Sequence, residues 1–593
     1  MVFPPGILYI SKLLPTFLGP PLAACFLKWL YDTYFNILVP RWLFALLCLT
    51  SFPIVFAIKV QFKLYVDRRA AASHGAILPP TVPSSIGGID VIRAAMRDMA
   101  KEYPGEALAL LAKDLGHTFC MRILFEDRFF TSEPEYLKAI LATQFNSFEK
   151  GEDARVIFGP LLGSGVIHRT MTRPFFKRDR ISDFELFDRH SLHAVAQIKK
   201  RFHEGHPIDF QDMISRFAMD ASSEFLFGRD AQTLSATLPY PFYVPMAPTS
   251  GPTDSSTEFA AALNRAQLVS IQRGRFGAAW PLSEFWHDKL EGSMRVIRAF
   301  LDPILREAVA RRQASSSEKV LDTNGAVKDR EVQEGETLTE HLLNYTEDPT
   351  TLRDEILNIS VAGRDTTASL LTFVVYMLSG HQHVLEKLRF EILTTVGSDR
   401  APTPDDFRDM KYLRAVLNET MRLYPPVPFN MRSTTTSVLL PSTTGGKPFY
   451  LPAKSKVPFS VLLMHRRTDL WGPDAAEWDP DRSSMRGFTN IVLTPNPFIF
   501  LPFNAGPRIC LGQQFAYHET SFFIARLLQN FSSIALAPAA QPAFSVLNPT
   551  ESSPLGWKKA EQLTVKSHIT LFIQGGLWVS MEGVDGNEME ATV

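Results

Sequence analysis

Cys510 is the clearest candidate for chemistry in this chain. It lies in the run 503–512 (FNAGPRICLG), and an apolar segment with helical spacing follows directly at 513–531. The unpaired N–H groups and partial positive charge at a helix start favour a thiolate there. Gly506 allows the run to turn, and Gly512 has no side chain to keep a flat ligand from the backbone. A thiolate is a soft ligand that promotes O–O cleavage when axial on haem iron, so the run predicts a haem-thiolate site. The alternative interpretation is a buried cysteine that only packs.

A second candidate group lies on a helix predicted over 351–379. Ala362 and Gly363 are small neighbours in an otherwise bulky helix. A glycine inside a helix costs about 1 kcal/mol relative to alanine, and the close approach of haem and dioxygen would compensate. The hydroxyl of Thr366 can both donate and accept a hydrogen bond, and Asp365 can supply it with protons. Asp365 and Thr366 are therefore the predicted catalytic pair; the alternative is a kinked core helix with a solvated aspartate.

Glu419 and Arg422 form a candidate structural pair. Residues three apart share one face of a helix, here predicted over 411–424. An exposed pair of this kind contributes little to stability. If Arg482, in the segment 478–482 (WDPDR), joins them in a buried network, removing one partner becomes costly. The expected role is to hold the loop that carries Cys510.

Four segments together resemble the cytochrome P-450 superfamily. The run around Cys510 resembles its haem-binding loop, residues 362–367 (AGRDTT) its oxygen-activating groove, Glu419–Arg422 its Glu-x-x-Arg pair, and 478–482 the segment that adds a second arginine. They occur in the family's order, and the resemblance covers residues 90–593. Two further runs, 464–469 and 494–508, look like fungal microsomal members that oxidise alkanes and fatty acids.

The resemblance implies the cytochrome P-450 fold, mainly α with small β-sheets, holding haem b. Its propionates need cationic partners, and arginine binds carboxylates bidentately. The residues expected to bind the cofactor are Arg169, Arg432, Phe503, Gly506, Arg508 and Gly512.

The segment 162–169 departs from the family. Relatives carry a tryptophan a few residues before the arginine that corresponds to Arg169, whereas this segment (LGSGVIHR) has none and looks short. The departure puts the role of Arg169 and haem affinity in doubt.

Composition is that of a globular protein. The chain has 593 residues with 45% hydrophobic residues, 21% charged residues and a formal net charge of −1, so no basic excess suggests nucleic acid. Four cysteines in this length do not make a disulfide framework, and Cys120 is expected to pack in a strand.

The N-terminal region is predicted to anchor the chain in a membrane. Residues 42–58 are uncharged and just long enough to span a bilayer. Residues 3–27 are a possible second apolar segment, broken up by prolines. The excess of Lys and Arg after residue 58 predicts a cytosolic body. The resulting domains are an anchor region at 1–70, a Pro-rich linker at 71–90 and a catalytic domain at 91–593, with location in the endoplasmic reticulum membrane.

Hydrophobic periodicity predicts a mainly helical body. Helices are expected over 91–113, 133–147, 208–227, 289–312, 351–379, 381–397 and 411–424. Strands are expected over 118–124, 127–131, 437–440 and 456–463, with a hairpin turn at Gly445-Gly446 and a solvated loop at 313–340.

The functional hypothesis is a monooxygenase that hydroxylates lipophilic substrates such as alkanes or fatty acids with O₂. Its expected partners are an NADPH-cytochrome P-450 reductase, with cytochrome b5 as a further option, and the membrane; no nucleic acid is expected. The basic residues at 169–180 could dock an acidic electron donor or be a solvated face. Two alternatives remain: a catalytically impaired haem- or lipid-binding protein, and an isomerase or dehydratase of the same fold acting on lipid peroxides.

Overall fold

The computed structural model covers the chain and describes most of its residues. The described ranges are 3–35, 40–91, 93, 103–163, 172–176, 184–245, 255–314, 336–443, 445–484, 496–547, 555–557 and 561–584.

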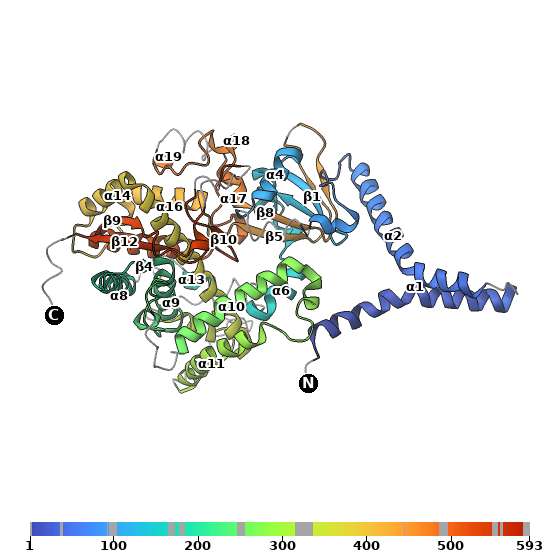
Figure 1. Ribbon diagram of the computed structural model, residues 1–593, viewed down its shortest axis with the longest axis horizontal. Coiled ribbons are helices and arrows are strands. Elements are labelled where there is room, and N and C mark those ends of the chain that lie inside the picture. The colour runs from blue at the N-terminus through green and yellow to red at the C-terminus, as the bar shows by residue number, and fades with distance from the viewer. Residues whose placement is uncertain are drawn as a thin grey trace, which may run out of the picture.

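Long helices make up most of the body, and the predicted mainly helical fold with small sheets is confirmed (Figure 1). The helices of ten or more residues are α1 (Pro5–Phe35), α2 (Arg41–Ser73), α4 (Glu106–Leu115), α6 (Glu152–Leu162), α8 (Phe184–His203), α9 (Phe210–Phe227), α10 (Ser255–Phe276), α11 (Glu291–Ala314), α13 (Pro349–Gly380), α14 (Gln382–Thr395), α16 (Lys411–Leu423) and α21 (Gln513–Asn530).

Shorter elements connect them. The short helices are α5 (Pro134–Lys138), α12 (Leu338–Leu343), α15 (Asp406–Asp409), α17 (Val461–Met464), α18 (Thr468–Trp471) and α19 (Asp481–Ser484). The strands are β1 (Thr118–Ile123), β2 (Glu126–Thr131), β3 (Phe148–Glu149), β4 (Ile208–Asp209), β5 (Phe429–Thr434), β6 (Val438–Leu440), β7 (Phe449–Leu451), β8 (Lys456–Ser460), β9 (Phe531–Leu536), β10 (Val565–Ser567), β11 (Leu571–Ile573) and β12 (Trp578–Gly583).

The largest described sheet has five strands in the order β1-β2-β8-β5-β3. Strand β2 runs parallel to β8, whereas the β3–β5 and β5–β8 pairs are antiparallel. Strands β6 and β7 pair antiparallel around the predicted Gly445-Gly446 turn, where Gly445 has a φ of 78°. Cys120 is buried in β1, as expected.

Helix α13 runs through the core. It packs against α9, and the largest apolar cluster includes Phe217 of α9, Val374 of α13, Leu417 of α16 and Phe523 of α21. Local capping explains where α13 begins: the Asp348 side chain accepts hydrogen bonds from the N–H groups of Thr350 and Thr351, ahead of a proline in the first turn.

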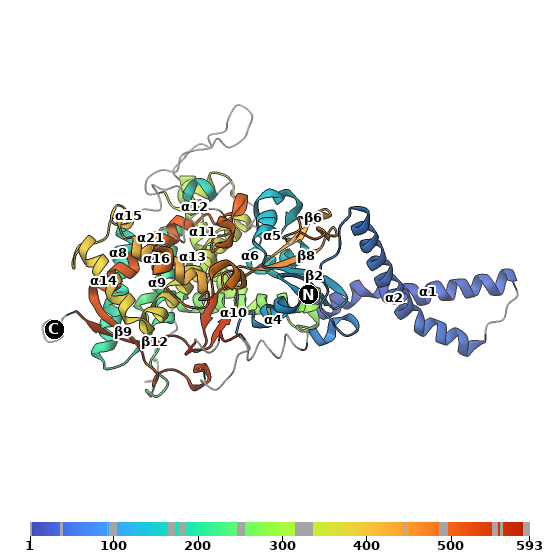
Figure 2. The same ribbon diagram turned by 90° about the horizontal axis from the view of Figure 1, so that it is seen from above.

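Helices α1 and α2 form a hairpin that projects from the body (Figures 1 and 2). Both are long and apolar enough to cross a membrane, with mean hydropathy of 1.4 and 2.2 in their most apolar windows. The expectation that prolines interrupt the first apolar segment is wrong, because α1 continues through Pro15, Pro20 and Pro21. Prolines are tolerated where a neighbouring helix covers the freed carbonyls, and the rings of Phe17 and Phe52 lie 4.5 Å apart between α1 and α2.

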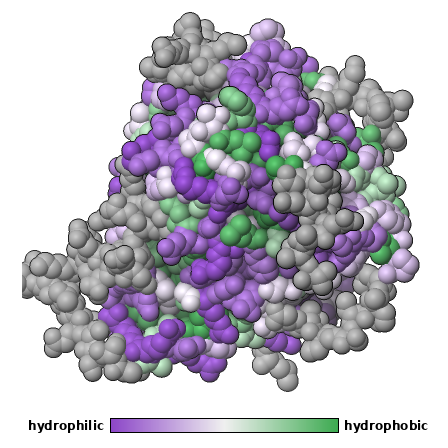
Figure 3. Space-filling model, turned by 90° about the vertical axis from the view of Figure 1, so that its left-hand side faces the viewer, coloured by the Kyte–Doolittle hydropathy of each residue, from purple (hydrophilic) through white to green (hydrophobic). Residues whose placement is uncertain are grey.

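Both ends of the hairpin contact the body. The N–H of Gly6 donates to the carbonyl of Phe285 at 3.0 Å, and Ala71 packs with Tyr450. The Pro-rich segment after α2 also lies along the body: the N–H of Cys120 donates to Pro80 at 2.7 Å, and that of Val82 to Cys120 at 2.9 Å. The opposite end of the body presents a mostly hydrophilic face (Figure 3).

Candidate haem-thiolate site

The loop that carries Cys510 is held by its own backbone and by a close approach to Ala139–Thr143. The N–H of Cys510 donates to the carbonyl of Phe503 at 2.9 Å, and α21 begins three residues later at Gln513. Gly506 has a φ of 62°, and a Cβ there would lie 2.3 Å from the carbonyl oxygen of Leu141. Glycine is therefore required at 506 for both backbone shape and space.

The loop leaves the cysteine accessible. Cys510 is exposed, and a Cβ on Gly512 would meet no atom within 4 Å. The aromatic ring of Phe503 packs against the core, 5.2 Å from the ring of Tyr517 on α21. The loop 503–512 therefore holds an exposed sulfur atom on a backbone that is fixed by the Cys510–Phe503 hydrogen bond and by the packing of Phe503 against Tyr517.

Ala362 and Gly363, the two small residues on α13, are also accessible rather than buried. Ala362 is exposed although α13 has buried residues on either side of it, and Gly363 has only Ser222 near the position of a Cβ, at 3.8 Å. The Thr366 hydroxyl donates to the Ala362 carbonyl at 2.6 Å. This bond holds the hydroxyl against its own helix and leaves its lone pairs to accept a second hydrogen bond.

Among the described residues, the hydrogen bond of the Asp365 side chain links it to α10 rather than to Thr366. Its Oδ2 accepts from Nε2 of Gln267 at 2.6 Å, and its Oδ1 lies 3.5 Å from Nη1 of Arg364. The same Arg364 nitrogen donates to Oδ1 of Asn264 at 2.9 Å. Two residues of α10 therefore fix the acidic group that sequence reasoning assigns to proton supply.

A second acid lies beside this turn of α13. Thr367 donates to Oε2 of Glu519 at 2.8 Å, which joins α13 to α21, the helix that follows Cys510. Burial raises the pKa of Glu519 to about 8, and its Oε1 has no hydrogen-bond partner among the described residues. Glu519 is therefore a neutral, buried carboxylic acid at pH 7. Sequence reasoning missed it because a glutamate within an apolar helix has no motif of its own.

Arg432 and Arg508 converge beside β3 without a carboxylate to pair with among the described residues. Arg432 is buried, and burial with the nearby Arg508 charge lowers its pKa to about 10. Arg508 donates to the carbonyl of Phe148 at 2.7 Å. The Nε of Arg432 and the Nη1 of Arg508 are buried, and neither has a hydrogen-bond partner in the part of the chain that the structure describes. Two such guanidinium groups need an anion, because unpaired buried charge is costly.

These residues fit a haem group. Cys510 would supply the soft ligand, Ala362 and Gly363 a flat surface of small residues, and Arg432 and Arg508 the cations for two propionates. Arg169, the third expected propionate partner, lies outside the described residues, as does most of the short segment 162–169.

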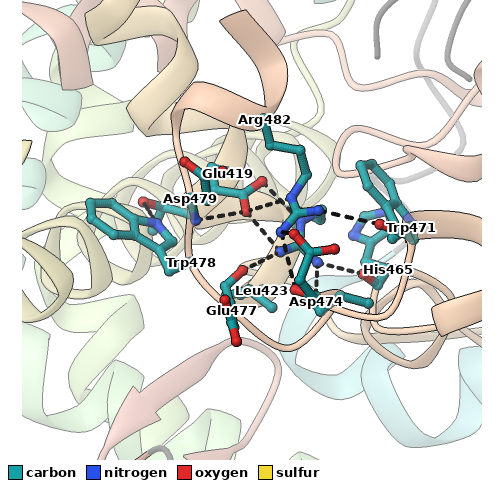
Figure 4. Close-up of polar contacts among 12 residues, drawn as sticks. Glu419, Leu423, His465, Trp471, Asp474, Glu477, Trp478, Asp479 and Arg482 are labelled. Carbon is teal, nitrogen blue, oxygen red and sulfur yellow. Dashed lines mark hydrogen bonds and ion pairs between the residues drawn. The ribbon is translucent and has the colours of Figure 1, made fainter. Parts of the chain in front are cut away.

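Glu419, Arg422 and Arg482 come together in one buried network. Figure 4 shows Glu419 and Arg482 in it. Arg422 binds Glu419 bidentately, at 2.9 Å through Nε and 2.7 Å through Nη2. Arg482 approaches Glu419 at 3.4 Å. The remaining donors of Arg422 bind three carbonyls, those of His465, Ala475 and Glu477.

His465 connects this network to the cysteine loop. Its Nε2 accepts a hydrogen bond from the N–H of Leu501 at 3.0 Å, two residues before Phe503. Burial and the Arg422 charge lower the pKa of His465 to about 3, so its ring stays neutral and can accept. This connection could not be predicted from the sequence, since His465 and Leu501 are 36 residues apart in the chain.

A comparison with known families identifies the family of this chain. The family described as Cytochrome P450 matches residues 94–546 of this chain. The chain therefore belongs to the cytochrome P450 family, is an oxygen-incorporating oxidoreductase, and uses a haem-iron cofactor.

Several fungal relatives carry the same class name. Cytochrome P450 monooxygenase pvhE of Talaromyces variabilis is 32% identical over 571 residues, covering 90% of this chain and 95% of that protein. Cytochrome P450 52E1 of Candida apicola is 34% identical over 68% of this chain and 75% of its own length. Cytochrome P450 52A1 of Candida tropicalis is 35% identical over 69% of this chain and 73% of its own length.

Proposed function

We propose that this chain is a membrane-anchored haem-thiolate monooxygenase that hydroxylates lipophilic substrates such as alkanes or fatty acids. The observation that carries the proposal is that α21, which follows the exposed Cys510, is hydrogen-bonded to α13, which carries the exposed Ala362. Cys510 immediately precedes α21, and α21 is hydrogen-bonded through Glu519 to Thr367, next to the Ala362–Thr366 turn. When bound there as haem b, the cofactor supplies the oxygen-activating chemistry of the family.

Ligand binding, proton transfer and positioning of the cysteine loop would each depend on different residues of the chain. The Cys510 thiolate would hold the iron, and Arg432 and Arg508 would hold the propionates. The Thr366 hydroxyl would pass on a proton supplied by Asp365, once the Asp365 side chain turns from its hydrogen bond with Gln267. The network of Glu419, Arg422 and Arg482 would keep the cysteine loop in position through His465.

The surface of the body next to the α1–α2 hairpin exposes apolar side chains, which is consistent with an apolar substrate that enters from the membrane. The segment after Trp280 carries exposed Leu282 and Trp286, and its Phe285 contacts the beginning of α1. Exposed apolar residues beside a membrane hairpin would face lipid rather than water. A substrate dissolved in the bilayer would then meet the body at this point.

The hairpin also suggests an orientation. Because the start of α1 and the end of α2 both contact the body, two spans would return the chain to its starting side. We propose that this is the cytosolic side of the endoplasmic reticulum membrane. Four basic residues follow the apolar part of α2, and cytosolic flanks of membrane spans carry an excess of Lys and Arg: Lys59, Lys63, Arg68 and Arg69. A separate NADPH-cytochrome P-450 reductase, with cytochrome b5 as a further donor, would supply electrons there.

The test is turnover by the purified full chain with reductase, NADPH and either a long-chain alkane or a fatty acid. The proposal predicts a hydroxylated product that needs both O₂ and NADPH. A haem-loaded protein that consumes no NADPH with any lipophilic substrate would support the impaired-protein alternative. Rearrangement of a lipid hydroperoxide without NADPH would support the isomerase alternative.

A further inference from the structure

Helices α1 and α2 pack side by side in a register that side-chain contacts define at two levels (Figures 1 and 2). At one level, the rings of Phe17 and Phe52 lie 4.5 Å apart. At the other, Nζ of Lys28 lies 5.6 Å from the centre of the Phe44 ring. The residue number rises along α1 and falls along α2 between these levels, so the two helices are antiparallel.

The two cysteines of the hairpin lie opposite each other between these levels. Cys25 is three residues before Lys28 on α1, and Cys48 is four residues after Phe44 on α2. Each is therefore about one helical turn from the Lys28–Phe44 contact, on the same side of it. The thiols of Cys25 and Cys48 are hydrogen-bonded to each other across the hairpin. This contact agrees with the register of the contacts on both sides of it.

Both thiols are free, and neither is enclosed by protein. Cys25 is exposed and Cys48 is half-buried. The exposed side chains near them on the two helices are apolar, and in a membrane they would face lipid: Leu22, Phe26, Leu47 and Leu49. The pair is therefore open to molecules dissolved in the bilayer.

The positions of the cysteines along the helices also place them inside the bilayer. Cys25 is ten residues from the end of α1 at Phe35, and Cys48 is seven residues from the start of α2 at Arg41. With a rise of 1.5 Å per residue, the thiols lie about 10–15 Å from these helix ends, within a hydrocarbon core about 30 Å thick. Access governs the chemistry of thiols and disulfides, so an oxidant dissolved in lipid reaches this pair more readily than a reductant dissolved in water.

We propose that Cys25 and Cys48 are a dithiol that a lipid hydroperoxide oxidises to a disulfide, which crosslinks α1 to α2. One sulfur attacks the O–O bond of the hydroperoxide, which gives a sulfenic acid and a lipid alcohol. The second sulfur then displaces the sulfenic oxygen, which leaves as water while the S–S bond forms. Two thiols and one hydroperoxide thus give one disulfide, one alcohol and one water.

The crosslink would act on the contacts between the hairpin and the body. The start of α1 is held by the hydrogen bond from Gly6 to Phe285, and the end of α2 by the packing of Ala71 with Tyr450. A disulfide between the two helices restricts their separation, so oxidation should keep the start of α1 against the segment that carries Phe285. The proposal concerns the hairpin that the proposed function sets in the membrane, and it does not depend on the chemistry at haem.

The experiment exposes the full-length protein in lipid vesicles to a fatty-acid hydroperoxide. Remaining thiols are then blocked with a maleimide, and the denatured protein is digested with trypsin without reductant. Cleavage after Lys12, Lys28, Arg41 and Lys59 gives peptides 13–28 and 42–59, each with one cysteine. Mass spectrometry should detect the two peptides joined, at the sum of their masses less two hydrogen atoms. Thiol treatment of the digest should separate them.

The matched control is Cys48→Ser/Leu49→Cys. It keeps one cysteine in peptide 42–59 but moves the thiol by one residue, about 100° around α2, to a position where the side chain is 79% exposed. The joined peptides should be absent from this variant. Equal yields from wild type and the control would overturn the facing geometry, and no joined peptides in wild type would overturn the disulfide.

Two further arms separate the source of the oxidant and the origin of the crosslink. Equal crosslinking by hydrogen peroxide at the same concentration would overturn oxidation by a lipid-borne peroxide. In a mixture of unlabelled and nitrogen-15-labelled chains, joined peptides should be wholly light or wholly heavy, and pairs of one light and one heavy peptide would show a contact between chains instead. Failure of the monooxygenase function would appear separately, as a lack of NADPH-dependent product with the crosslink unchanged.

Discussion

Replacement of Arg422 by methionine should destabilise the protein far more than loss of an exposed arginine pair. Arg422 is 1% exposed and donates two hydrogen bonds to Glu419 and three to carbonyls of His465, Ala475 and Glu477. Its removal leaves Glu419 with Arg482 at 3.4 Å as its remaining cation among the described residues. Breaking a buried pair by removing one partner costs about 3–5 kcal/mol.

The matched control is Arg400→Met. Arg400 also binds a carboxylate bidentately, that of Asp406 at 2.8 and 2.9 Å, but its side chain is 49% exposed. An exposed pair contributes about 1 kcal/mol or less. The burial of the two carboxylate pairs, rather than their geometry, sets the expected difference.

The assay is urea unfolding of the haem-loaded protein, followed by far-ultraviolet circular dichroism and by the Soret band. Because His465 joins Arg422 to Leu501 in the cysteine loop, the Soret band of Arg422→Met should disappear at lower urea than its helical signal. The double variant Glu419→Leu/Arg422→Leu should cost less than the sum of the single ones, since the partners act as a unit. Equal losses of stability in Arg422→Met and Arg400→Met would refute the reasoning.

Three other predictions follow from the site and the hairpin. Because the pKa of Glu519 is raised from 4.5 to about 8, the folded state binds more protons than the unfolded state between these pH values, and the free energy of unfolding should fall as pH rises through this window. Glu519→Gln should flatten this pH dependence in unfolding titrations from pH 5 to 8. An unchanged pH dependence in the variant would contradict the prediction. Asp365→Asn should lower product formation about a hundredfold, the low end for lost acid–base assistance, without loss of the haem spectrum; undiminished turnover would remove Asp365 from proton supply. Deletion of residues 3–59, which contain α1 and the apolar part of α2, should move the protein from carbonate-washed membranes to the supernatant, and persistence in the pellet would show that another surface binds lipid.

The sequence predicted best those features whose residues are close together in the chain. The start of α21 at Gln513 follows from the apolar run after Cys510, and α13 was expected over 351–379 and extends from Pro349 to Gly380. The Gly506 turn could also be predicted, because a positive φ next to a tight contact demands glycine. In each case the local chemistry of a few residues determines the structure.

Contacts between distant segments could not be predicted. The bond from Gln267 to Asp365 joins residues 98 apart, and the pairing of Phe148 with Thr434 depends on the register of β3 and β5. A register is a property of two strands, and β5 was not expected because its polar residues Asn430 and Arg432 obscure the strand pattern.

Two of the helices that were not predicted, α8 and α10, were missed for a similar reason. Helix α8 buries His190 and Arg201, and α10 buries Gln267 and Arg273. Buried polar side chains break the apolar periodicity on which a helix prediction depends, although their hydrogen bonds inside the protein stabilise them there. Arg273, for example, pairs with Glu284 at 2.6 Å.

An absorption spectrum of the reduced, carbon-monoxide-bound protein can show whether the Cys510 sulfur binds haem iron. We expect a Soret band that is shifted to the red in wild type and absent from Cys510→Ser. The Cys120→Ser variant, which changes a cysteine buried in β1, should keep the shifted band. A wild-type spectrum without the shift, or a shifted band that survives in Cys510→Ser, would contradict thiolate ligation by this residue.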